Sequence, residues 1–435
     1  MDRFHEIIRF LSDPNTAWVL AGTLLLGLSS GVLGAFAFLR KRGLMGDVLA
    51  HAALPGICLA FMLTGSKNPF FFLIGATVTG VLASLAINGI TRFSRIKEDT
   101  ALGLVLSVFF GLGIIFLTQI QHSENGNQSG LDKFLFGQSA SLVGDDVLVM
   151  GGVALSLLLF CFLFFKEFKL LCFDPGFGRS LGFPVGLLDL LLMVMLVVAV
   201  VIGLQAAGVV LMAALIITPA AAARYWTERL GVMVVLSALM GALSGVLGTL
   251  FSALVHNLPT GPLIVVAATV VFLISLVFSP KRGLVAKWAR LARTRREWAQ
   301  ERVLTILYES RETDGLHEMD MDGLLERYAF SHRRLEAALR SLERDGFITW
   351  EQDGSLIRCT KAGWQKAYDL VLQTRLTEVW MMHEEEVGGM LRDRENGTMR
   401  EDIPADLFRE LSDLLVRHGR EPKWKPGNTE EGATR

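Results

Sequence analysis

The sequence has few cysteines, no phosphate-binding loop and no signal-peptide pattern. Only four cysteines occur in 435 residues, and none has the spacing of a disulfide framework or a thiolate metal site. No Gly-x-x-x-x-Gly-Lys-Ser/Thr sequence occurs, so we do not expect the chain to be an enzyme that hydrolyses ATP. Residues 1–15 are polar and charged, without the apolar core of a signal peptide.

The average composition hides two unlike halves. Hydrophobic residues make up 51% of the chain, the net charge is -1 and the mean hydropathy is +0.44. Residues 1–280 consist of long apolar runs, which predicts an all-α polytopic membrane protein with about eight or nine transmembrane helices. The pair of runs flanking Gln205 could be one broken element. The predicted spans are 16–39, 47–65, 70–91, 101–119, 147–165, 184–204, 206–223, 230–255 and 261–279.

Lysine and arginine are distributed unequally between the loops that join these spans. The loops on one side hold basic residues at 40–42, 92–97, 166–179 and 224–229. The other side holds Lys67 and Lys133, with Arg3 and Arg9 in the N-terminal segment. Because basic loops stay in the cytoplasm, we expect a multi-pass protein of the cytoplasmic (inner) membrane, with its N-terminus outside and its C-terminal half in the cytosol.

Residues 43–56 combine polar ligands with an apolar helix. Asp47 and His51 are four residues apart and therefore share one helical face. Pro55 and Gly56 follow, and Pro55 cannot donate a hydrogen bond to the carbonyl of His51. Ionisable groups at membrane depth usually mark an ion or substrate path, so the segment predicts a path beside a helix break. Alternatively, both side chains lie at the headgroup level and end a helix.

This pattern resembles the permease subunit of ABC importers for manganese, zinc or iron. Similar segments follow in the family's order, at 135–137, 208–220 and 258–262, and the resemblance extends from about residue 16 to 280. It implies that Asp47 and His51 are metal ligands in the transport path. It also implies a transported divalent metal ion as substrate, with no permanently bound cofactor. The implied partners are an ATP-binding subunit and an extracytoplasmic metal-binding protein.

The ligand types also agree with a transported transition metal. Carboxylate with imidazole suits zinc, manganese or ferrous iron. One chain offers only these two side chains, so a second permease subunit, either a copy or a homologue, would complete a transient site. Pro219 predicts a second helix break at the path, and Asp189 is the other buried acid, with a possible place on the route. Polar residues of the outer loops could meet an arriving cation or simply be solvated: His122, Glu124, His256 and Asn257.

The loop between the fifth and sixth predicted spans is the candidate for docking an ATPase. Asp174 and Pro175 form a cap and first-turn pair, and Gly182 follows the short helix that contains Gly178. The segment resembles the coupling helix that such permeases place in a groove of their ATPase. An ordinary capped turn is the alternative.

Residues 281–300 form a basic linker in which tryptophan and leucine alternate with lysine and arginine. This pattern predicts a helix that lies on anionic membrane lipids, or only a positive anchor. Residues 301–420 then predict three short helices and a hairpin turning at Asp353-Gly354, which is a cytosolic winged-helix domain. Its recognition helix would be 331–344. The possible DNA-binding residues are Ser331, which would also cap this helix, His332, Arg333, Arg334 and Arg340.

This region resembles metal-dependent regulators of the diphtheria-toxin-repressor type through residues 360–370 and 375–378. Thr374 stands where that family has a metal-binding histidine, and a downstream Glu-His pair is missing, although His383 precedes three glutamates. Residues 421–435 are polar, with glycine and proline, and predict a disordered tail. Three functions remain open: the metal-ion permease, a permease for metal chelates, and a membrane-tethered regulator of transcription, alone or in a dual role with transport.

Overall fold

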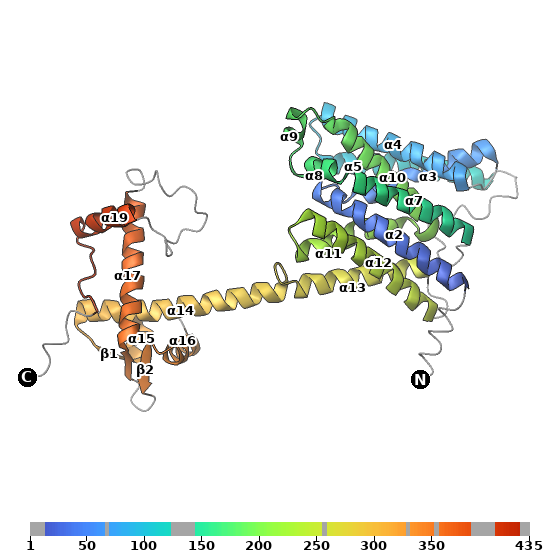
Figure 1. Cartoon of the computed structure of the whole chain (residues 1–435). Helices are drawn as coiled ribbons and strands as arrows, with labels where there is room; N and C mark the ends of the chain where they lie inside the picture. Colours follow the sequence, from blue (N-terminus) through green and yellow to red (C-terminus); the bar gives the residue numbers. More distant parts are fainter. Residues whose placement is uncertain are drawn as a thin grey trace, which may run out of the picture. The chain divides into compact units, whose positions relative to one another are not determined.

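The computed structural model describes residues 14–65, 69–122, 144–254, 259–327, 331–351, 356–383 and 405–426. The chain divides into two compact units, Met1–Lys287 and Trp288–Arg435, which are described separately below (Figure 1). The predictions for 135–137, Glu124, His256, Asn257 and the turn at Asp353-Gly354 concern residues outside the described ranges.

The first unit is a bundle of apolar helices. Within the described residues, seven helices are long and apolar enough to cross a membrane, and a bent pair would make an eighth. The protein is therefore a mostly helical, multi-pass membrane protein. The helices are α2 (Pro14–Leu39), α3 (Met45–Thr64), α4 (Pro69–Phe93), α5 (Glu98–His122), α7 (Gly144–Leu163), α8 (Phe165–Phe173), α9 (Pro175–Ser180), α10 (Val185–Ala207), α11 (Val209–Trp226), α12 (Leu230–Leu254) and α13 (Thr260–Phe278).

Two of the nine predicted spans differ from the structure. The fifth is not straight, because α7 and α8 meet at a bend of 67° where Phe164 leaves the helical conformation (φ -95°, ψ 19°). The seventh is the shorter apolar helix Leu211–Trp226. The break between the sixth and seventh lies at Gly208, whose φ of 79° favours glycine, and not at Gln205.

Both predicted proline breaks were wrong. Helix α3 continues through Pro55 and Gly56 to Thr64, and α11 continues past Pro219 to Trp226. Proline removes one donor and its ring crowds the carbonyl four residues back, but its φ is helical, so the helix persists where neighbouring helices support it. Gly56 serves close packing instead: a Cβ on it would lie 2.1 Å from the carbonyl oxygen of Gly75 in α4.

Helix α2 is the central element of this unit. It packs against α12, α11, α7 and α10 and lies between these pairs in Figure 1. Its contact with α12 brings backbone against backbone, since a Cβ on Gly241 would lie 2.2 Å from the carbonyl oxygen of Gly27. Ser237 of α12 also donates a hydrogen bond to the carbonyl of Gly31 (2.7 Å). Small residues thus permit close helix approach.

This contact gives a first testable prediction. Gly241→Ala should destabilise the protein by about 1–3 kcal/mol, because the added methyl group has no space and must push α2 and α12 apart. The measurement is the melting temperature of the purified chain in detergent. Gly152→Ala in α7 is the matched control, because its Cβ meets nothing within 4 Å. Equal melting temperatures for the two variants would contradict the close-packing interpretation.

The second unit combines helices with a small sheet. Strands β1, β3 and β2 lie in that order, all antiparallel, and Ile357 of β3 pairs with Met319 and Trp350. Leu307, Leu339 and Ile357 are among the buried core residues. The elements are α14 (Leu284–Asp314), β1 (Glu318–Asp320), α15 (Met321–Arg327), α16 (His332–Arg344), β2 (Ile348–Glu351), β3 (Leu356–Cys359), α17 (Lys361–Met382) and α19 (Ala405–Arg417).

Three details of this unit differ from the sequence predictions. The linker 281–300 and the first predicted helix after it belong to one helix, α14. Ser331 occupies the N-cap position of α16 but makes no capping hydrogen bond with its side chain. Residues 421–426 are ordered, contrary to the predicted disordered tail: Trp424 lies 5.3 Å from Trp364 between ring centroids, and the guanidinium carbon of Arg311 lies 3.6 Å from the Trp424 ring.

Candidate functional site

The predicted ligand pair lies near the beginning of α3. Asp47 is in the first turn of this helix, and its carboxylate oxygen lies 3.6 Å from Nε2 of His51. The side chains are 40% and 25% exposed, respectively. The i, i+4 spacing therefore brings an acid and an imidazole together, as the sequence predicts. A divalent ion placed beside this pair would find both ligand types within reach.

The other side of the His51 ring faces the protein. Its ring packs edge-to-face on Phe110 of α5 (centroids 4.7 Å). Its Nδ1 is buried and has no hydrogen-bond partner within the described residues. Those residues contain no group of three or more His, Cys, Asp or Glu side chains that could hold a metal ion. Within the part of the chain that is described, Asp47 and His51 thus supply two ligands and the surroundings supply an apolar wall.

A partly buried cluster of charges lies at the same end of the helices. Asp189 of α10 accepts from Arg40 (2.8 Å) and from Arg42 (3.0 Å), and Arg42 also pairs with Glu98 of α5 (2.8 Å). Lys41, between the two arginines, has a left-handed φ of 60°, and the arginines on both sides of it reach Asp189. We call these four residues, Arg40, Arg42, Glu98 and Asp189, the charge cluster.

The charge cluster changes the interpretation of Asp189 as a residue of the transport route. As the second acid in an apolar span it was a candidate for the transport route, but two guanidinium groups hold its carboxylate. This pairing could have been expected from the sequence, because a carboxylate in an apolar span requires a partner. Arg40 and Arg42 directly follow the end of the neighbouring α2. The cluster connects the α2–α3 turn, α5 and α10, and Arg40 also donates to the carbonyl of Leu171 in α8 (3.2 Å).

The predicted coupling segment is the short helix α9. Its N-cap residue Asp174 accepts from the backbone N–H of Phe177 (2.8 Å), and Pro175 occupies the first turn. Gly178 is buried, and Gly182 has a left-handed φ of 83°. Four large apolar side chains are exposed around this helix: Phe173, Phe177, Leu181 and Phe183.

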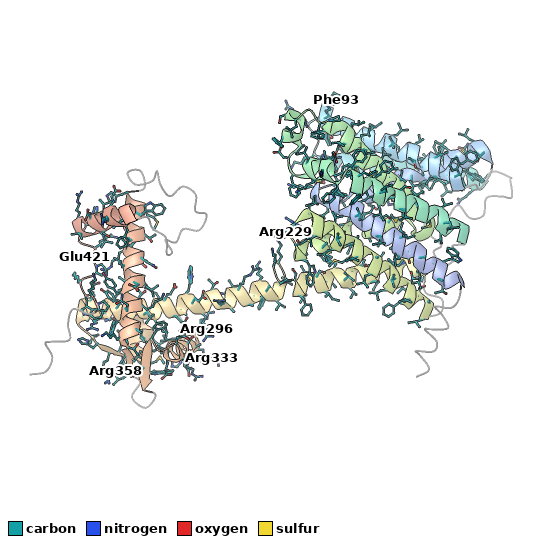
Figure 2. All side chains as sticks on the ribbon, viewed as in Figure 1. Phe93, Arg229, Arg296, Arg333, Arg358 and Glu421 are labelled. Atoms are coloured by element: carbon teal, nitrogen blue, oxygen red, sulfur yellow. The ribbon has the colours of Figure 1, made fainter. Side chains whose placement is uncertain are left out.

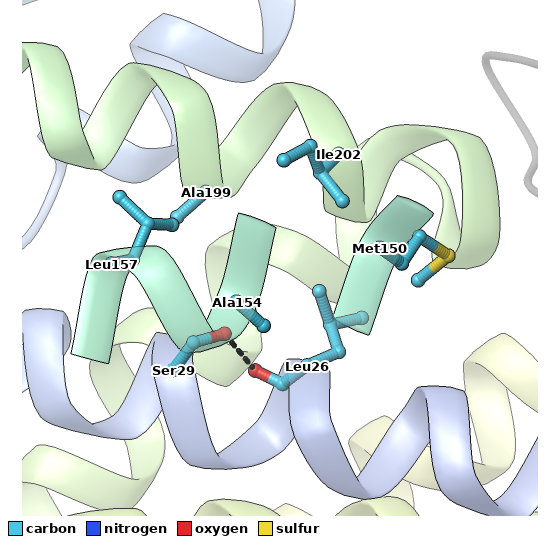
Figure 3. A pocket seen from close by; sticks show the side chains of 7 residues that line it. All are labelled: Leu26, Ser29, Met150, Ala154, Leu157, Ala199 and Ile202. Atoms are coloured by element: carbon cyan, nitrogen blue, oxygen red, sulfur yellow. Dashed lines mark hydrogen bonds between the residues drawn. The ribbon is translucent and has the colours of Figure 1, made fainter. Parts of the chain in front are cut away.

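A cavity between α2, α7 and α10 is too small for a hydrated ion. It measures about 10 Å³, which is near the least space that one water molecule needs. Figure 3 shows that apolar side chains surround it and that Ser29 points back to the carbonyl of Leu26, with which it forms a 3.2 Å hydrogen bond. His122 lies beside an open groove at the end of α5 and is exposed.

The predicted DNA-binding residues lie on one exposed helix end. Ser331, His332, Arg333 and Arg334 are all exposed at the beginning of α16, while Leu335 and Leu339 face the core. Arg340 forms an ion pair with Glu336 one turn away. Figure 2 labels Arg333 on α16. Four of the five predicted DNA-binding residues therefore lie together, whereas Arg340 is paired with Glu336.

Arg375 has a structural role in the second unit. It pairs with Glu312, which is only 7% exposed, and the backbone N–H of Lys423 donates to the same carboxylate (2.6 Å). Burial acts to raise the pKa of Glu312, but the hydrogen bonds from Arg375 and Lys423 outweigh it and lower the pKa. The pair fixes residues 420–424 to α14 and α17.

Comparisons with known proteins show which family the chain matches. The ABC 3 transport family matches residues 12–279. The chain is 48% identical to the manganese transport system membrane protein MntC of Bacillus subtilis, over 97% of this chain and 96% of that protein. It is 43% identical to the zinc transport system membrane protein TroC of Treponema pallidum, over 66% and 96%.

A solved structure agrees with these sequence matches. The structure titled PsaBC from Streptococcus pneumoniae in complex with Fab is 35% identical, with a TM-score of 0.58, and the match covers 66% of this chain and 99% of the matched one. The match to MntC covers 97% of this chain and therefore includes most of residues 288–435. The second unit therefore has a counterpart in that relative.

Proposed function

Because the chain belongs to the ABC 3 transport family, we propose that it is the membrane permease of an importer that brings manganese into the cytoplasm. The full-length similarity to a protein named for manganese transport supports this ion, and zinc, named for TroC, is the alternative. The chain performs no bond chemistry; it supplies a gated route, and a separate ATP-binding subunit supplies the energy.

The adjacent carboxylate and imidazole at the beginning of α3 are the observation that carries this proposal. Asp47 and His51 lie 3.6 Å apart and partly exposed, in a bundle built mostly of apolar helices. An ion that sheds part of its water here would exchange it for one oxygen and one nitrogen ligand. A second permease subunit, either a copy or a homologue, would double this set around a shared axis. Two side chains from each are enough to select an ion and few enough to release it.

The distribution of basic residues supports the orientation. Arg40, Arg42 and the end of α4 at Phe93 lie on the side with basic loops, which we assign to the cytoplasm. The charge cluster and α9 then face the ATP-binding subunit, the second unit is cytosolic and the N-terminus is outside. An extracytoplasmic metal-binding protein delivers the ion on the opposite side, and the basic residues of α14 near residue 290 contact anionic lipids.

The test of this function is uptake by reconstituted vesicles that contain this chain, its ATP-binding subunit and its binding protein. Radiolabelled manganese, zinc and iron are offered separately. We expect ATP-dependent accumulation of manganese. Accumulation of zinc instead would reassign the ion, and no accumulation of any ion by an assembled complex would favour a metal-chelate substrate.

Docking of the ATP-binding subunit on α9 gives a second testable prediction. Phe177→Asp should weaken binding of that subunit at least about tenfold, because it places a charge in an apolar interface centre. The measurement is the amount of ATPase that copurifies with the permease, or its affinity in nanodiscs. Phe93→Asp is the matched control: Phe93 is 85% exposed and Phe177 is 54% exposed. Undiminished binding by the Phe177 variant would exclude α9 as the coupling helix. Asp174, Pro175, Gly178 and Gly182 are proposed to hold its shape.

DNA binding by the second unit is a second candidate function. The three-stranded sheet beside α15 and α16 supports a winged-helix arrangement, and the exposed basic end of α16 supports contact with phosphates. Binding of an operator by the full chain in nanodiscs would support a dual role or a membrane-tethered regulator. Binding that is independent of sequence and disappears with salt would reflect charge alone.

A further inference from the structure

Two histidines of the second unit face each other at a place that no predicted site includes. His383 occupies the C-cap position of α17, and His418 follows the last residue of α19. Their Nε2 atoms lie 3.4 Å apart, with ring centroids at 5.0 Å. The residues are 35 positions apart in the sequence, so the approach is produced by packing.

The hydrogen bond on the far side of His383 decides which nitrogen is available. Its Nδ1 lies 3.1 Å from the carbonyl oxygen of Val379. A carbonyl oxygen only accepts, so Nδ1 carries the proton and Nε2 of the neutral ring presents its lone pair to His418. Metal-bound histidines are oriented by the same kind of backbone contact.

The distance between the two nitrogens has the value that a shared metal ion requires. Imidazole nitrogens bind zinc at about 2.0–2.1 Å, and at a tetrahedral angle two of them are about 3.4 Å apart. Without a metal, a proton on Nε2 of His418 can occupy the same gap as an N–H···N hydrogen bond. An ion bound by both nitrogens would replace that proton.

The scaffold under the pair is rigid. Helices α17 and α19 share a small core of Leu376, Val379, Leu411 and Leu415. Arg420, two residues after His418, pairs with Glu378 (2.7 Å). This ion pair engages the carboxylate of Glu378, and His418 is exposed, so water can complete the coordination. In the sequence, Glu384, Glu385 and Glu386 follow His383 directly, although they lie outside the described residues.

We propose that His383 and His418 bind a divalent ion of the later first-row transition metals, such as zinc, and thereby fasten α19 to α17. Two imidazoles favour these ions over manganese. The site lies in the unit that follows the permease segment, and it is separate from the Asp47 and His51 pair. It would therefore bind metal whether or not the permease carries manganese.

The test measures zinc bound per chain by equilibrium dialysis of the full-length protein in nanodiscs. We expect one ion whose affinity falls at least about tenfold in both His383→Ala and His418→Ala, as loss of a ligand requires. The variant with Asp47→Ala and His51→Ala should keep this ion, and so should the matched control His317→Ala, because His317 is another exposed histidine of this unit.

Two further readouts separate ligation from folding. Zinc should raise the melting temperature of the wild type and of His317→Ala, but not that of His383→Gln, which keeps a polar side chain of similar length. Cobalt bound in place of zinc should show the visible absorption of a low-symmetry nitrogen site in the wild type. His383→Gln should not show this absorption. Zinc binding that is unchanged in both alanine variants would overturn the proposal.

Discussion

We expect uptake of the metal ion to fall to background when alanine replaces either Asp47 or His51. An ion that enters the apolar bundle must exchange water for protein ligands, and this carboxylate and this imidazole lie 3.6 Å apart near the beginning of α3. Loss of an outer partner of a metal ligand already costs about 10–100-fold, so removal of a ligand should cost at least about 100-fold in transport. The measurement is ATP-dependent accumulation in the reconstituted vesicles.

The same vesicles supply the controls for this prediction. His122→Ala should transport normally, because His122 is an exposed histidine at the far end of α5. Copurification of the ATP-binding subunit with both path variants shows that assembly is intact. Normal uptake by Asp47→Ala and His51→Ala alike would remove both residues from the path and would leave the family relationship untouched.

The sequence predicted those features that depend on local spacing. Asp47 and His51 were placed on one face by their separation along a helix, and the structure has them in contact distance. Asp174 was predicted as a cap, and it accepts from Phe177 as expected. In each case, fewer than five residues carry the information, so tertiary packing has little to change.

Features that depend on distant partners were missed or wrong. Pro55 was expected to break α3, but the tertiary contact of Gly56 with Gly75 supports the helix through it. Residues 421–426 have a polar composition, yet Trp424 is held by aromatic and cationic partners more than 50 positions away. The bend at Phe164 has no proline or glycine to announce it. These three features depend on which helices and side chains pack together in the folded protein.

The charge cluster gives the other prediction with a large expected effect. Asp189→Asn should destabilise the protein by about 3 kcal/mol, because removing one partner of a buried ion pair leaves uncompensated charge. The side chains of Asp189, Arg40 and Arg42 are only 16%, 19% and 12% exposed. Arg42 keeps Glu98, whereas Arg40 loses its carboxylate. The measurement is thermal unfolding of the purified chain in detergent.

A double-mutant cycle tests whether the effect comes from the pair. Because Arg40→Met removes the charge that Asp189→Asn strands, the two changes together should cost less than the sum of the single changes, by about 0.5–3 kcal/mol. Glu297→Gln is the matched control, since its partner Arg293 is exposed and such a pair contributes no more than about 0.5 kcal/mol. Strict additivity would mean that Asp189 stabilises α10 without Arg40. Non-additivity would mean that the α2–α3 turn, which precedes Asp47 by only a few residues, is attached to α10 by an ion pair. A movement of either element would then displace Asp47 and His51, the proposed metal ligands.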